Sequence, residues 1–164
     1  MIKRILIIII VVLILAQFLQ PSNKNNGIAE SATDITHTIH VPDSVLSILK
    51  QSCYDCHSNH TNYPWYNKIT PVNYFLDNHV RNGKKELNYT TFGTYSYKKM
   101  ARKLDETAEI IEKGNMPLHS YLWIHKDAAL RDAQQKTLID CANAAKEEVM
   151  RDSTSGKTQP TLKN

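Results

Sequence analysis

The sequence predicts an all-α domain with long loops, and three observations lead to this class. Four segments place apolar residues at the i, i+3, i+4 and i+7 positions of amphipathic helices. No segment alternates polar and apolar residues over a length that would indicate a strand. Glycines and prolines separate the helical patterns, as they do in turns and loops. A chain of 164 residues leaves room for one small domain of this kind.

The first twenty residues differ from the rest of the chain. Lys3 and Arg4 precede the apolar run ILIIIIVVLILAQFL, which only Gln17 interrupts. Positive charge before such a run is typical of an export signal whose charged end stays in the cytoplasm. No convincing small-residue cleavage site follows, which favours an uncleaved signal anchor over a cleaved signal peptide. We therefore expect residues 1–20 to be a membrane segment and the remainder to lie outside the cytoplasm.

Composition divides the exported part into three regions. Residues 21–41 are polar and lack helical periodicity, which predicts a flexible linker. Residues 42–151 carry the helical patterns and form the predicted domain. Residues 152–164 are again polar, and we expect a disordered tail there.

The first two predicted helices flank a pair of cysteines. One helix starts near Pro42 and runs to the first cysteine, with Val45, Leu46 and Leu49 at helical spacing. The second starts at Pro71, a residue that favours the first helical position, and continues to about residue 80. Its apolar residues and one histidine share a face: Val72, Phe75, Leu76 and His79. The segment from residue 81 to 95 contains two glycines and is predicted to be a loop.

Two further helices complete the domain. The third is predicted over 95–113 and ends at Gly114, with one apolar stripe made of Tyr97, Met100, Ala101, Leu104, Ala108 and Ile111. The fourth is predicted from about Asp132 to Arg151, with an inner face of Leu138, Cys141 or Ala142, Ala145 and Val149. The connection between these two helices is predicted to be non-helical or broken.

Cys53, Cys56 and His57 form a Cys-x-x-Cys-His motif, which three kinds of site can contain. A structural zinc site needs a second pair of ligands at short spacing, and the chain offers no such pair. A thioredoxin-like redox pair needs a βαβ context, and the sequence predicts no strands. A c-type haem fits the motif as it stands. The two thiols add to the two vinyl groups of the porphyrin, and His57 is then placed to bind the iron.

Such a haem needs a sixth iron ligand, for which Met116 is the first choice. Met116 precedes Pro117 on a loop that cannot continue as helix, well downstream of the motif. Met/His ligation raises the reduction potential and suits electron transfer. Four other residues are alternative sixth ligands: Met100, His79, His119 and His125. His60 is expected to be exposed, and Cys141 to be a small buried side chain.

The charge pattern indicates no nucleic-acid partner. The formal net charge is +4, and basic residues alternate with acidic ones in KKMARKLDETAEIIEKG. This mixture predicts a solvated helix face instead of a basic patch.

The motif and its surroundings resemble the bacterial haem-binding domain family of small exported, cytochrome c-like proteins. The matching stretches are SCYDCHSNHTNYPWYNKITPV, GKKELNYTTF, EKGNMPLHSYLWIHKDAAL and the final helix. The resemblance covers about residues 42–150 and implies a single c-type haem attached at Cys53 and Cys56, with His57 as proximal ligand. Its Met-Pro element corresponds to Met116 and Pro117. The family ends this loop with His-Pro, whereas His125 is followed here by Lys126.

The sequence therefore predicts a cytochrome c-like helical domain with long loops around one haem. The expected function is a membrane-anchored electron carrier on the periplasmic side of the bacterial inner membrane, working with redox partner proteins. A haem-based redox or gas sensor, or a peroxidase-like haem enzyme with an open sixth position, is the alternative. No acid–base group around a substrate pocket is evident, so no catalytic residue is assigned.

Overall fold

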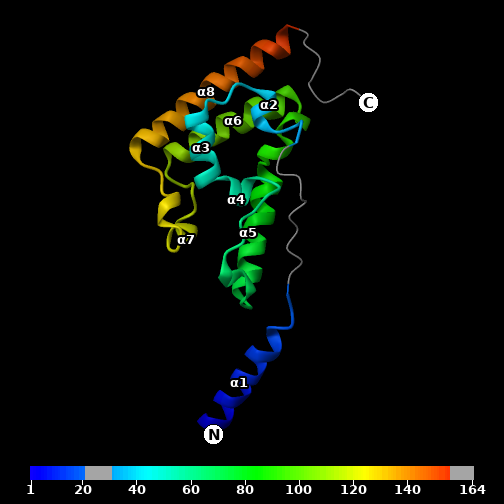
Figure 1. Ribbon diagram of the computed structural model, residues 1–164, viewed down its shortest axis with the longest axis vertical. Coiled ribbons are helices and arrows are strands. Elements are labelled where there is room, and N and C mark those ends of the chain that lie inside the picture. Colours follow the sequence, from blue (N-terminus) through cyan, green and yellow to red (C-terminus); the bar gives the residue numbers. More distant parts are fainter. Residues whose placement is uncertain (21–30, 156–164) are drawn as a thin grey trace.

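The computed structural model describes residues 1–20 and 31–155, and every regular element within them is a helix. The all-α prediction is thereby confirmed (Figure 1). In chain order the α-helices are α1 (Ile2–Ala16), α2 (Ile35–Thr38), α3 (Asp43–Ser52), α4 (Tyr54–His57), α5 (Val72–Glu86), α6 (Tyr97–Glu112), α7 (His119–Leu122) and α8 (Asp132–Thr154). Three 3-10 helices intervene: η1 (Trp65–Lys68), η2 (Tyr89–Thr94) and η3 (Lys126–Ala128). The shortest of these elements lie in segments predicted to be loops, because a single turn shows no periodicity in the sequence.

Helices α6 and α8 pack against each other and run alongside each other in Figure 1, and α2, α3 and η2 complete the core. The apolar stripe predicted for the third helix is confirmed on α6, where Met100 is fully buried and Leu104 and Ile111 nearly so. Ser96 begins this helix because its side chain accepts a hydrogen bond from the backbone N–H of Lys99. The facing side of α8 buries the residues predicted for it: Leu138, Ala142, Ala145 and Val149.

The domain starts earlier than the sequence indicates. Residues 31–41, predicted to belong to a linker, contain α2 and bury Ile35 and Ile39 in the core. Asp34 caps α2 by accepting a hydrogen bond from Thr36 N at 3.0 Å. At the other end, α8 continues to Thr154 and so enters the predicted tail. The remaining linker residues 21–30 and tail residues 156–164 lie outside the described part of the chain.

Helix α5 is longer than predicted, and the face that it buries differs from the predicted one. It continues through Gly83, a residue expected to lie in a loop, and ends at Glu86. Its buried residues are Asn73 and Val80, whereas Val72 and Phe75 are exposed. The face expected to be apolar and inward is therefore only partly buried.

Helix α1 buries none of its side chains, and residues just after it contact the segment that leads into α5. Gln17 and Thr70 make two reciprocal hydrogen bonds, of 3.0 Å and 2.9 Å. In the described part of the chain, no helix combines the length and the apolar character needed to span a membrane.

Candidate functional site

The Cys-x-x-Cys-His motif forms a single helical turn. Cys53 ends α3, where its N–H donates to Leu49 O at 2.9 Å. The same residue begins α4, where His57 N–H donates to the Cys53 carbonyl at 3.0 Å. Both motif cysteines are free and partly buried. The local geometry thus presents two thiols and one imidazole from one turn.

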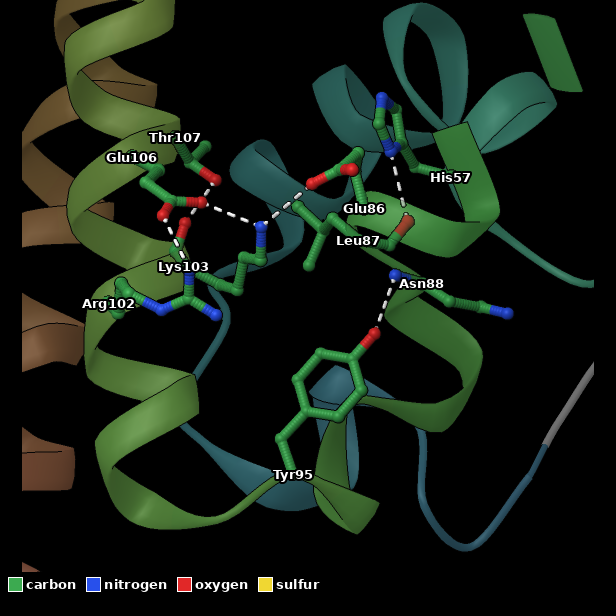
Figure 2. A network of polar contacts seen from close by, with 9 residues as sticks. All are labelled: His57, Glu86, Leu87, Asn88, Tyr95, Arg102, Lys103, Glu106 and Thr107. Carbon is green, nitrogen blue, oxygen red and sulfur yellow. Dashed lines mark hydrogen bonds and ion pairs between the residues drawn. The ribbon is translucent and has the colours of Figure 1, made fainter. Parts of the chain in front are cut away.

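The tautomer of His57 is fixed by its hydrogen bond to the end of α5. The Nδ1 atom lies 3.0 Å from the carbonyl oxygen of Leu87 (Figure 2). A carbonyl can only accept, so the proton is on Nδ1 and the lone pair of Nε2 is available. Burial lowers the pKa of His57, against the opposing effect of hydrogen bonds to Leu87 and Gly83. A neutral imidazole oriented through Nδ1 is the form in which histidine binds a metal.

Gly83 lets α5 approach the motif closely. A Cβ atom at this position would lie 2.6 Å from the carbonyl oxygen of Cys56. Because that neighbour is backbone, a side chain here would force the helix and the motif apart. The glycine that resembles a loop marker in the sequence is thus required by packing.

Substituting Gly83 by alanine is expected to destabilise the fold by about 1–3 kcal/mol, as other overpacked sites do. In an open helix the same change would stabilise by about 0.5–1 kcal/mol, so the sign of the effect is diagnostic. Urea unfolding followed by circular dichroism measures it. The exposed Lys85→Ala on the same helix is the control, with an expected change within about 0.5 kcal/mol. A Gly83→Ala variant more stable than the wild type would contradict the close packing.

Two adjoining cavities, each of about 200 Å³, open beside the motif. Side chains of Leu87, Tyr89, Ile110, Ile111 and Leu130 give the first an apolar wall. The second is lined by residues that include Cys56, His79, Asn82, Gly83, Leu118 and Tyr121. Six residues line both: Ser52, Cys53, His57, Glu86, Met116 and Pro117. The structure therefore brings the two predicted axial ligands, His57 and Met116, together with both thiols around one slot.

The segment that carries Met116 is tied to the motif from the side of α7. Tyr121 Oη donates to Asp55 Oδ2, inside the motif, at 2.8 Å. His125 stacks on Tyr121 with ring centroids 4.3 Å apart and is 2.7 Å from Tyr66 Oη. These contacts hold the loop over the slot. No local pattern in the sequence indicates them, because their partners are far apart in the chain.

The alternative sixth ligands differ in whether they line the slot. Met100 is fully buried in the core and lines neither cavity of the slot. His119 is exposed, and His125 is engaged with the two tyrosines. His79 does line the second cavity, with its Nδ1 bonded to Phe75 O at 2.8 Å. Among the histidines considered, His79 is thus the one beside Met116.

The remaining predicted positions lie away from the slot. His60 is exposed, as expected. Cys141 is only partly buried and packs against the core, where Ala142 takes the fully buried position. Among the residues described, no group of three or more His, Cys, Asp or Glu side chains is arranged to hold a metal ion.

Both motif thiols are protonated at neutral pH. Burial raises the pKa of Cys53 to about 12, and the neighbouring Cys56 adds to the effect. The pKa of Cys56 is raised to about 11, again chiefly by burial, with a contribution from Asp55. Neither side chain therefore has the thiolate character of a reactive redox cysteine.

Lys103 also belongs to the site, although no motif in the sequence indicates it. Its side chain is only 8% exposed and lies in the wall of the first cavity. The Nζ atom is 2.7 Å from Glu106 and 3.3 Å from Glu86 (Figure 2). Burial alone would lower the pKa of Lys103, but its bonds to Glu106 and Glu86 raise it. The expectation that this stretch of α6 is wholly a solvated face is therefore wrong at Lys103, which is adjacent in sequence to Leu104 of the apolar stripe.

A comparison with protein-family models identifies a match. The model described as "Haem-binding domain" matches residues 11–144, which is most of the chain. This segment contains the motif, α5, and the loop that carries Met116. Searches of curated proteins and of solved structures gave no match. The slot is where the fold can accept a large apolar group, and the matched segment spans all of its walls. The chain therefore belongs to the haem-binding domain family.

Proposed function

We propose that this haem-binding protein is a c-type cytochrome that carries single electrons. The observation that supports the proposal most is that His57, Met116 and Cys53 each line both halves of one slot. A haem held between histidine and methionine supplies one-electron chemistry, because the iron alternates between its ferrous and ferric forms.

The residues of the slot fit one haem in chemical terms. His57 offers Nε2 because Leu87 holds Nδ1, and Met116 offers a thioether. The thiols of Cys53 and Cys56 would each add across a vinyl group. In each addition a sulfur–carbon bond forms and the thiol hydrogen passes to the neighbouring vinyl carbon, so no further reactant is consumed. The apolar wall of the first cavity would exclude water from the ring.

The N-terminal segment supports a location at the bacterial inner membrane. Residues 1–20 combine Lys3 and Arg4 with an apolar run, the pattern of an export signal. We propose that this segment stays attached and holds the domain on the periplasmic side. This location suits covalent haem attachment, which takes place outside the cytoplasm. The electron donor and acceptor would then be redox proteins of the same compartment.

Covalent attachment is tested by changing both motif cysteines. The wild type, produced in a bacterial host with cytochrome c maturation, is expected to carry the mass of one haem after denaturation. Cys53→Ala combined with Cys56→Ala should lose that mass entirely, because no thiol remains in the slot. Electrospray mass spectrometry of the denatured protein measures the difference.

Cys141→Ser is the matched control, since Cys141 packs against the core away from the slot. It is expected to retain the full haem mass. A wild type without covalent haem, or with two haems, would overturn the proposed attachment.

A further inference from the structure

The end of the domain next to α1 exposes a group of large apolar side chains. We call this surface the apolar tip, and its residues come from η1, the residue that follows it and the start of α5: Trp65, Ile69, Val72, Tyr74 and Phe75. Trp65 is 75% exposed and Phe75 is 58% exposed. Lys68 is exposed beside them. Clustered exposed apolar groups in a soluble domain mark a surface that contacts something else.

Hydrogen bonds join the tip to the residues that follow α1. Thr70, in the middle of the tip, makes the reciprocal pair with Gln17 and also donates from Oγ1 to Leu19 O at 3.1 Å. Asn73 is fully buried and donates to Gln20 Oε1 at 2.8 Å. These bonds fix the tip at the C-terminal end of α1, and Figure 1 shows α1 below the lower end of α5.

We infer that the apolar tip lies on the lipid bilayer, as a second membrane contact beside the N-terminal segment. The inference rests on the anchoring proposed above. The tip adjoins a helix that buries none of its apolar side chains, so an inserted α1 would bring the tip to the headgroup region. Tryptophan and tyrosine are enriched at that depth, and Lys68 favours anionic lipids. Helix α1 has 15 residues, and each adds about 1.5 Å to its length. An inserted helix this short would hold the domain close to the membrane surface.

The two tryptophans of the chain provide a direct test. Trp65 is in the tip and Trp123 lies in the turn after α7, and both are 75% exposed. Trp123→Phe leaves Trp65 as the sole tryptophan, and Trp65→Phe leaves Trp123. Each full-length holoprotein is reconstituted into phosphatidylethanolamine and phosphatidylglycerol vesicles, with and without brominated acyl chains. For each variant, the fluorescence intensity in brominated vesicles is divided by the intensity in vesicles without bromine. Quenching by haem is the same in both and therefore cancels.

Trp65 is expected to lose most of its fluorescence to brominated lipid, whereas Trp123 should keep most of its intensity. Adding Ile69→Glu to the Trp65-only protein should reduce the quenching, because a charge is placed in the tip. Protein that floats with the vesicles but shows equal, weak quenching of both tryptophans would overturn the tip contact alone. Trp65 that is shielded from aqueous iodide yet not quenched by lipid would indicate a protein partner and overturn it too. Failure to float would overturn the anchoring and, with it, this inference.

Discussion

Replacing His57 by glycine is expected to abolish the low-spin haem spectrum of the protein. The imidazole is the neutral, oriented donor of the slot, held through Nδ1 by the carbonyl of Leu87 at 3.0 Å. Removing only the partner that orients a metal-bound histidine costs about 10–100-fold in affinity, so loss of the ligand itself should cost at least as much. Absorption spectra of purified protein, normalised to its concentration, measure the effect.

Added imidazole separates a missing ligand from a misfolded chain. If His57→Gly removes only the ligand, imidazole should restore a low-spin spectrum by occupying the space left in the slot. His119→Ala is the control, because His119 is exposed and lines neither cavity of the slot. A His57→Gly protein with an unchanged spectrum would remove this histidine from the iron. A folded variant that imidazole does not restore would contradict the ligand role as well.

Replacing Met116 by alanine is expected to change the spin state of the ferric protein. Met116 lines both cavities, and the contact between Tyr121 and Asp55 ties its loop to the motif. Without the thioether the wild-type sulfur band in the near-infrared should disappear. The ferric iron should become high-spin, or low-spin with a second histidine. Near-infrared magnetic circular dichroism distinguishes these states.

We expect His79 to be the histidine that replaces the methionine. His79 lines the second cavity together with Met116, so the double variant Met116→Ala, His79→Ala should be high-spin even if the single variant is not. Met100→Leu is the control, since Met100 is fully buried in the core and the exchange conserves its volume. A Met116→Ala spectrum identical to that of the wild type would exclude Met116 as a ligand. An open, high-spin iron in the wild type would favour a sensor or an enzyme over an electron carrier.

The features that could be predicted from the sequence are those carried by short spacings. The stripe of α6 and the inner face of α8 repeat at helical intervals, so their existence and buried residues were predictable. The Cys-x-x-Cys-His motif fits within one turn, and the proline after Met116 predicts that this residue lies on a non-helical loop. The structure gathers these residues around one slot.

What could not be predicted depends on contacts between distant segments. Glycine is typical of loops, and only the close approach of Cys56 shows why Gly83 lies within a helix. Lys103 resembles a surface lysine until Glu86, seventeen positions earlier, is placed beside it. The short segment around Ile35 has too few residues for a periodic signal, yet its side chain is buried in the core. Each of these outcomes is decided by tertiary packing, which local propensity does not contain.

Helix α5 connects the two ends of the molecule that matter for its proposed role. It starts within the apolar tip and ends just before Leu87, whose carbonyl holds His57. Its 15 residues rise about 22 Å at 1.5 Å per residue. In a membrane-bound protein the length of this helix would therefore set the distance between the proposed redox centre and the lipid surface. Partners able to exchange electrons with it would be those whose own centres reach that height.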